Sequence, residues 1–317
     1  MTDARPAESL WEAYGKALVE LGEMDPEVVV LAAEPSGLAG AEAFRGRFPT
    51  RFFKAGAGEP SLIAAAAHHA QEGQRVYAST SAGFVAGAAY SSVRDSFCRP
   101  RLNVTIVADE GGGPTESGLE AALFLEDIGI LRGLPGMTVV VPADAPSTRG
   151  AMIALHAHPG PAYLRLARGL LPTVTDGSFQ IGRAAELRSG GDLTIVAVGR
   201  LVASALDVAG ELAKVGISTR VLDFASVKPF DEPALLRAAR DTGAILVLEE
   251  HTVLTGVGAL VASTTAENYP VPVRRVGVPD LFTETTDPRE RLERYGLGPG
   301  RIRDEAWELL RLRGKVT

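Results

Sequence analysis

Continuous apolar runs alternate with helix-spaced apolar residues through the first half of the chain. Residues 28–33 read VVVLAA and residues 102–108 read LNVTIVA, and runs rich in β-branched residues are typical of strands buried on both faces. Residues 8–22 instead place apolar side chains at helical spacing. The same patterns predict further strands at 75–79, 137–141 and 162–166, and further helices at 63–70, 84–98, 119–133 and 147–156. This alternation predicts a doubly wound parallel sheet.

A segment without long periodicity separates this pattern from a second one. Residues 170–192 contain Pro172 and several glycines. Beyond them, strands are predicted at 193–198, 218–223, 244–249 and 271–278, and helices at 203–214, 232–241, 256–266 and 301–313. We therefore expect an α/β protein with two doubly wound domains and mostly parallel sheets. The domains are predicted at 1–172 and 192–317, with a linker at 173–191.

Composition narrows the class of protein. The 317 residues are 46% hydrophobic, which is enough for two cores, and the net charge of −7 argues against non-specific nucleic-acid binding. Cys98 is the single cysteine, so neither an intrachain disulfide nor a cysteine-based metal site is possible. The chain has no apolar leader after Met1 and no apolar run long enough for a membrane span. We expect a soluble, cytoplasmic protein.

One carboxylate, that of Glu59, lies at the start of a predicted helix, directly after a glycine-rich turn. Glu59 follows the turn Gly56-Ala57-Gly58 and begins an alanine-rich helix. A carboxylate in the first helical turn is stabilised by the partial positive charge of the helix N-terminus. Glu59 by itself is therefore explained by helix stability alone, and Pro60 beside it fits the same interpretation. The motifs that follow it along the chain single it out.

The order of these motifs resembles a known family. After Gly58-Glu59 come Thr80-Ser81-Ala82-Gly83-Phe84, Leu125-Glu126-Asp127-Ile128, Pro135-Gly136-Met137-Thr138-Val139, Val141-Pro142-Ala143-Asp144, Glu249-Glu250-His251 and Pro279-Asp280-Leu281-Phe282. In this order and spacing they resemble the C-terminal half of transketolase and of 1-deoxyxylulose-phosphate synthases, in the form of the separate beta subunit of split transketolases. The resemblance covers roughly residues 8–315.

The resemblance implies catalysis with thiamine diphosphate. Glu59 matches the glutamate that hydrogen-bonds the N1′ atom of the aminopyrimidine, and a buried, apolar setting would raise its pKa and suit proton sharing with a ring nitrogen. Phe84 matches the aromatic residue that stacks on the pyrimidine, although core packing explains a buried phenylalanine equally well. Ser81 stands where the family has another phenylalanine, so the ring pocket is roomier there. The resemblance also assigns Gly58 and Glu34 to cofactor binding.

Half of the cofactor site is absent from the sequence. The family holds the diphosphate through Mg²⁺ bound to a Gly-Asp-Gly … Asn motif, and this chain has no Gly-Asp-Gly. The resemblance therefore implies an alpha subunit that carries the diphosphate-binding domain and most of the Mg²⁺ site, in an α₂β₂ assembly. We assign no metal ligand to this chain, since His156 and His158 are too poorly spaced to share one ion.

The substrate residues depart from those of sugar-phosphate transketolases. Glu110 and Ala122 stand where the family has histidines, and Trp11 stands where it has a phosphate-binding arginine, whereas Arg168 matches its other phosphate-binding arginine. These changes remove hydrogen bonds that orient a polyol phosphate, and Glu110 adds a charge that repels a dianion. We expect transfer of a two-carbon ketol or acyl unit, as in EC 2.2.1 transferases, to a small-molecule acceptor other than an ordinary sugar phosphate, in a specialised biosynthetic pathway.

The sequence leaves two other functions open. One is the beta subunit of a 2-oxoacid dehydrogenase E1, which would pass an acyl group to lipoamide. The other is a non-catalytic partner that only scaffolds or regulates, against which the retention of Glu59 argues. His251 is assigned either to interface structure or to the edge of the site.

Overall fold

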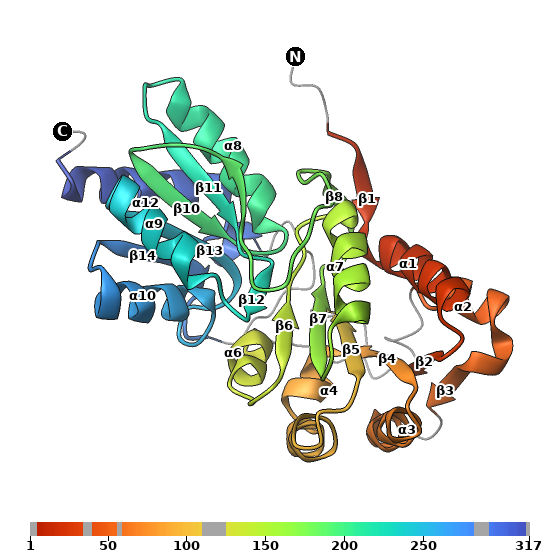
Figure 1. The fold of residues 1–317 in the computed structure, drawn as a ribbon. Coiled ribbons are helices and arrows are strands. Elements are labelled where there is room, and N and C mark those ends of the chain that lie inside the picture. Colours follow the sequence, from red (N-terminus) through yellow and green to blue (C-terminus); the bar gives the residue numbers. More distant parts are fainter. Residues whose placement is uncertain (1–4, 34–39, 56–58, 110–124, 282–291, 315–317) are drawn as a thin grey trace. The chain divides into compact units, whose positions relative to one another are not determined.

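The computed structural model describes residues 5–33, 40–55, 59–109, 125–281 and 292–314 (Figure 1). The contacts between residues divide the chain into two compact units. The first unit contains residues 1–111, 130–181 and 227–229, and the second contains residues 112–129, 182–226 and 230–317. Each unit is built on its own sheet.

The first unit is built on a seven-stranded sheet in the order β12-β6-β7-β5-β4-β2-β3. Its strands are β2 (Val28–Ala33), β3 (Phe52–Ala55), β4 (Arg75–Ser81), β5 (Val104–Asp109), β6 (Thr138–Val140), β7 (Ala162–Leu166) and β12 (Ser226–Lys228). The strands from β2 to β7 pair in parallel. Every residue of β2, β5 and β7 is buried, as expected for strands covered on both faces.

Helices cover both faces of this sheet. The helix α1 (Leu10–Met24) packs with α7 (Ala145–Ala157) over one face, together with α2 (Glu42–Arg47). On the other face, α3 (Glu59–Gln71) is joined by α4 (Ala82–Ala86), α5 (Tyr90–Val93) and a π-helical turn (Arg94–Cys98). The short elements are α6 (Asp127–Arg132), a 3₁₀ turn (Pro49–Arg51), and an antiparallel pair of β1 (Ala7–Ser9) and β8 (Leu170–Pro172).

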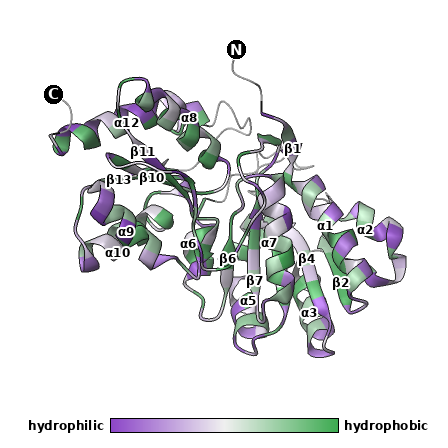
Figure 2. Cartoon of the chain, turned by 45° about the horizontal axis from the view of Figure 1, so that its top comes forward, coloured by the Kyte–Doolittle hydropathy of each residue, from purple (hydrophilic) through white to green (hydrophobic). Residues whose placement is uncertain are grey.

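The second unit has a five-stranded sheet in the order β14-β13-β10-β11-β9. Its strands are β9 (Ala185–Arg188), β10 (Leu193–Ala197), β11 (Thr219–Asp223), β13 (Ile245–Thr252) and β14 (Val273–Val278). All pair in parallel except β9, which runs antiparallel to β11. Figure 2 shows α8 (Leu201–Ala213) and α12 (Pro299–Leu312) on one side of the sheet, with α9 (Glu232–Thr242) and α10 (Val257–Asn268) on the other.

The predicted fold class is confirmed, because both sheets are mostly parallel and are flanked by helices on both faces. The predicted helix over 84–98 is confirmed only in part, because it is interrupted at residues 87–89. The chain leaves helical geometry at Gly87, whose φ is −98° and ψ is −96°, and then forms α5 and the π-helical turn. The predicted helix over 119–133 is confirmed only at Asp127–Arg132, and residues 119–124 lie outside the described part of the chain.

Candidate active site

The carboxyl ends of the parallel strands define one edge of the first sheet. The strands β2, β3, β4, β5 and β7 end there at Ala33, Ala55, Ser81, Asp109 and Leu166. The chain passes from β2 to β3 on one side and then returns to β4 on the other side of β2. Open α/β sheets bind ligands at such a reversal of strand order, beyond the carboxyl ends of the strands.

The sequence-predicted site residues follow these strand ends. Glu34 comes directly after β2, Gly58 and Glu59 after β3, Ser81 and Phe84 at the end of β4, Glu110 after β5, and Arg168 after β7. The topology therefore brings the described residues of this set, from distant parts of the sequence, to one edge. Glu34, Gly58, Glu110 and Ala122 lie outside the described residues, and Glu59 is described only by its backbone, as the first residue of α3.

Ser81 and Phe84 are linked by a helix cap. Ser81 ends β4 and is the N-cap residue of α4, where its Oγ accepts a hydrogen bond from the backbone N–H of Phe84 at 3.3 Å. This bond satisfies one of the amides that a helix N-terminus leaves free. The ring of Phe84 is buried, with 7% exposure. The cap fixes the backbone that places this aromatic ring at the switch-point edge of the sheet.

Trp11 belongs to the core of the first unit. It is 7% exposed and packs edge-on against Tyr14, with ring centroids 5.7 Å apart. The hydroxyl of Tyr14 hydrogen-bonds Ser79 Oγ on β4 at 2.8 Å, and burial raises the pKa of Tyr14. Trp11 therefore makes packing contacts within the core, at the position where the family resemblance expects a phosphate-binding arginine.

Arg168 is paired with a buried carboxylate that the sequence did not predict. Asp109 is 2% exposed and pairs in register with Leu166 of β7, two residues before Arg168. The Nε of Arg168 donates to Asp109 Oδ2 at 3.1 Å, and its Nη2 contacts the same oxygen. The predicted phosphate-binding arginine therefore shares its charge with Asp109. An acidic residue at the end of a predicted strand was the only signal in the sequence.

Comparison with known proteins decides the family. Residues 8–174 match the transketolase pyrimidine binding domain, and residues 182–302 match the transketolase C-terminal domain. The chain belongs to the transketolase family. Transketolases are transferases that depend on thiamine diphosphate, so this chain falls in that class of enzymes.

The relatives of this transketolase-family chain include separate subunits. It is 37% identical to the 6-deoxy-6-sulfo-D-fructose transketolase subunit SqwH of Clostridium sp. (strain MSTE9), over 97% of this chain and 94% of the relative. It is 33% identical to a subunit of the apulose-4-phosphate transketolase of Phocaeicola vulgatus, over 95% and 97%. Among solved structures, a split gene transketolase described as an inactive beta4 tetramer is 43% identical, with a TM-score of 0.89 and coverage of 96% and 99%.

The Glu-Glu-His motif of this transketolase-family chain stabilises the second unit. Glu249 accepts hydrogen bonds from the N–H groups of Val257 and Gly258 at 2.6 and 2.8 Å, at the start of α10. Glu250 forms an ion pair with Arg200 at 3.0 Å, and both side chains are buried. These contacts give the two glutamates structural roles.

His251 also has a structural role. It is fully buried, its Nε2 lies 3.1 Å from the backbone N–H of Gly129, and its Nδ1 lies 2.9 Å from the carbonyl oxygen of Thr252. An N–H only donates and a carbonyl only accepts, so the ring is neutral and carries its proton on Nδ1. Of the two roles expected from the sequence, these contacts support the structural one.

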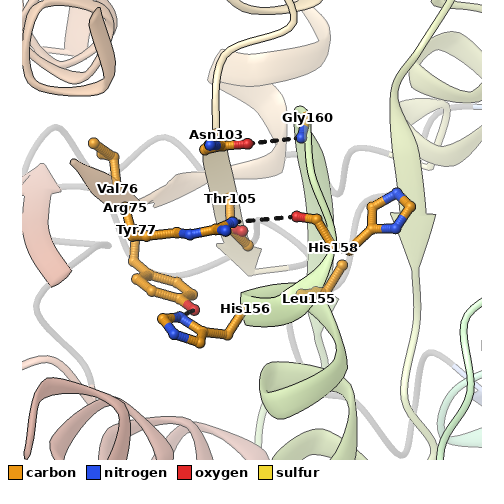
Figure 3. Close-up of a pocket in the computed structure, with 9 residues that line it drawn as sticks. All are labelled: Arg75, Val76, Tyr77, Asn103, Thr105, Leu155, His156, His158 and Gly160. Atoms are coloured by element: carbon orange, nitrogen blue, oxygen red, sulfur yellow. Dashed lines mark hydrogen bonds between the residues drawn. The ribbon is translucent and has the colours of Figure 1, made fainter. Parts of the chain in front are cut away.

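A small polar pocket lies at the opposite, amino edge of the first sheet (Figure 3). Arg75 and Tyr77 at the start of β4 line it with His156 and His158 from the end of α7. Arg75 donates to the carbonyl oxygen of His158 at 3.4 Å, and the Tyr77 hydroxyl lies 3.3 Å from His156 Nδ1. Because these groups bond to one another at the amino ends of the strands, the pocket is separate from the candidate active site.

Among the residues that the structure describes, no group of three or more His, Cys, Asp or Glu side chains is arranged to hold a metal ion. Across the same ranges, no helix has both the length and the apolar character needed to span a membrane.

Proposed function

We propose that this chain is the beta subunit of a two-component transketolase that transfers a two-carbon ketol or acyl unit. The observation that carries the proposal is the match to separate transketolase subunits over nearly the full length of both chains. By contrast, the chain spans only 48% of a 1-deoxy-D-xylulose-5-phosphate synthase of Desulforudis audaxviator, at 33% identity. The relation to single-chain enzymes is therefore that of a part to a whole.

The acceptor is a sugar derivative other than the ordinary ketose and aldose phosphates. Two of the relatives are named for 6-deoxy-6-sulfo-D-fructose and for apulose 4-phosphate. Trp11 packs in the core where the family has one phosphate-binding arginine, and Arg168 is paired with Asp109. Both features reduce the positive charge available to a sugar phosphate and so support the same inference. Glu110 and Ala122 stand in place of histidines, so they remove hydrogen bonds that would orient a polyol phosphate, which supports the same inference.

The residues at the carboxyl edge fit an aminopyrimidine. A carboxylic residue begins α3 and a buried aromatic ring begins α4, and these helices follow the two strands that flank β2. When bound, thiamine diphosphate supplies a nucleophilic carbon and an electron sink. Glu59 holds a proton shared with the pyrimidine N1′ and so sets the protonation state of that ring. Phe84 packs on the ring face, and the family resemblance assigns Glu34, Gly58 and Ser81 to cofactor binding as well.

A separate alpha subunit supplies the diphosphate and Mg²⁺ site. The absence of Gly-Asp-Gly from the sequence supports this division, as does the neighbouring split transketolase, whose beta4 tetramer is inactive. In this arrangement, residues 1–172 form the pyrimidine-binding domain, 173–191 the linker and 192–317 the C-terminal domain. The active assembly is α₂β₂.

Replacement of Glu59 tests the proposal. Glu59→Gln keeps the size of the side chain and removes its charge and its exchangeable proton, so the assembled complex forms but loses about 10²–10⁴-fold in two-carbon transfer. Glu72→Gln is the matched control, because Glu72 is exposed just beyond the end of the same helix. Assembly with the alpha subunit is measured by gel filtration. Turnover is measured from the aldehyde that the donor releases after it loses its two-carbon unit. Undiminished turnover in Glu59→Gln would overturn the assignment.

A further inference from the structure

The ion pair between Asp109 and Arg168 has an asymmetric environment. The Asp109 side chain is 3% exposed, whereas the Arg168 side chain is 37% exposed. Both Nε and Nη2 of Arg168 are directed at the same carboxylate oxygen, Asp109 Oδ2. The guanidinium therefore has one side against a buried carboxylate while the side chain is partly exposed. Arg168 follows the carboxyl end of β7, the edge of the sheet at which the candidate active site lies.

The buried carboxylate changes what the guanidinium can bind. An arginine without an acidic partner presents five donors and a full positive charge, which suits a phosphate dianion. Here two of the three nitrogens already contact Asp109, and the pair has a net charge of zero. A dianion approaching the exposed side of Arg168 is attracted by the guanidinium and repelled by Asp109 a few ångström farther away. Since Asp109 is buried, water screens that repulsion poorly.

We propose that Asp109 determines substrate specificity by acting through Arg168. The pair favours a substrate whose terminus near Arg168 is uncharged or carries a single negative charge over one that ends in a phosphate dianion. Asp109 is a positioning residue in this account, because it holds the guanidinium and balances its charge without touching the substrate. The inference rests on the proposed function, together with the family resemblance that matches Arg168 to a substrate-binding arginine.

The test compares two probes of similar size and different charge. At pH 8 methyl phosphate is a dianion, since the second pKa of such esters is about 6, whereas methanesulfonate is a monoanion. Their dissociation constants are measured by calorimetry on the full chain, alone and with the alpha subunit. Because the Coulomb energy scales with the charge of the probe, Asp109→Asn tightens methyl phosphate binding about tenfold and methanesulfonate binding about threefold.

Two further variants make the result specific. In Asp109→Asn/Arg168→Gln the gain disappears, because the guanidinium that Asp109 restrained is absent. Asp95→Asn is the matched control, because Asp95 is paired with arginines on an exposed turn, where its side chain is 47% exposed. It changes the net charge equally and leaves both dissociation constants unchanged. Equal gains for the two probes, a gain that survives in the double variant, or no methyl phosphate binding by Asp109→Asn overturns the inference.

A third variant keeps the test decisive if Asp109→Asn does not fold. Arg168→Gln alone leaves the Asp109 carboxylate without its Arg168 partner, so this variant binds methyl phosphate about tenfold more weakly than Asp109→Asn/Arg168→Gln, in which both charges are absent. Equal methyl phosphate binding by these two variants shows that Asp109 exerts no charge effect at this position and overturns the inference. Failure of this inference is distinguishable from failure of the proposed function. A complex that transfers two-carbon units without the expected discrimination refutes only the former, and discrimination without any transfer refutes only the latter.

Discussion

At the scale of single residues, His156 joins separate parts of the first unit. Its Nδ1 lies 3.3 Å from the Tyr77 hydroxyl on β4 (Figure 3). Its Nε2 lies 3.4 Å from Asp25 Oδ2, just beyond the end of α1. Burial lowers the pKa of His156, the Asp25 carboxylate opposes that change, and the Arg75 guanidinium adds to the lowering. The folded protein therefore favours the neutral imidazole.

This lowered pKa predicts a measurable dependence of stability on pH. Below the ordinary histidine pKa of 6.5 the unfolded chain binds a proton at His156 that the folded chain resists, so the free energy of unfolding falls as the pH decreases through that value. In His156→Gln this contribution is absent, and the difference in melting temperature between pH 7.5 and pH 5.5 becomes smaller. His68→Gln, on an exposed position of α3, keeps the wild-type difference. An equal difference in wild type and His156→Gln would contradict the assignment.

The identity of a residue in the sequence does not show which distant residue its side chain contacts in the fold. Asp109 and Arg168 are 59 positions apart, and their contact depends on the parallel pairing of β5 with β7. The family resemblance could therefore predict that Arg168 faces the site, but not that a buried carboxylate holds it. The same holds for His251, whose neutral tautomer is fixed by Gly129, 122 positions away.

At the scale of elements, the start of α10 depends on one carboxylate. Glu249, near the end of β13, accepts hydrogen bonds from the first amides of this helix. A Cβ on Gly256 would overlap Glu249 Oε2, and a Cβ on Gly258 would lie 2.8 Å from Oε1. Glycine at these positions allows the carboxylate to approach amides that would otherwise be buried without a partner.

We predict that Gly256→Ala destabilises the chain. Displacing the Glu249 carboxylate leaves a charged acceptor and helix amides unsatisfied, which costs about 2–4 kcal/mol in the free energy of unfolding. The control is Gly210→Ala within α8, where an added Cβ meets nothing within 4 Å, and which stabilises by about 0.5–1 kcal/mol. Urea unfolding of both variants checks the contrast. Two variants of equal stability would show that the carboxylate is not essential to the helix.

Long apolar runs made several elements predictable. The run at 28–33 forms β2 over the same residues, and the predicted helix at 232–241 forms α9 over Glu232–Thr242. The strands β1 and β8 were not predicted, because each has only three residues and shows no alternation of apolar and polar residues. They also pair with each other across more than a hundred positions of sequence. The predicted linker likewise contains β9, an antiparallel strand whose pairing with β11 leaves no local signal.

At the scale of the whole molecule, each of the two compact units includes a short segment that is flanked in the sequence by residues of the other unit. Residues 227–229 belong to the first unit, where β12 extends the sheet and Lys228 Nζ donates to the carbonyls of Arg132 and Leu134 at 2.9 and 2.5 Å. Residues 112–129 belong to the second unit, where Leu125 accepts a hydrogen bond from Thr252 at 2.8 Å. The hydrophobic pattern along the sequence predicts only a single boundary, because the assignment of these short segments depends on contacts between residues that are distant in the sequence.

The proposed division of the cofactor site between two subunits predicts how the purified chain behaves. We expect the 33.3 kDa chain to form a homo-oligomer by itself, like the beta4 tetramer of the similar split gene transketolase, and to transfer no two-carbon units, because the proposal assigns the diphosphate site to the alpha subunit. Affinity capture of the tagged chain from its own cells recovers a near-stoichiometric partner that carries Gly-Asp-Gly … Asn. Mixing the two then produces activity that requires both thiamine diphosphate and Mg²⁺, and light scattering gives the mass of α₂β₂. Thiamine-diphosphate-dependent transfer by the chain alone would refute the split site, because both halves would then have to reside in one polypeptide.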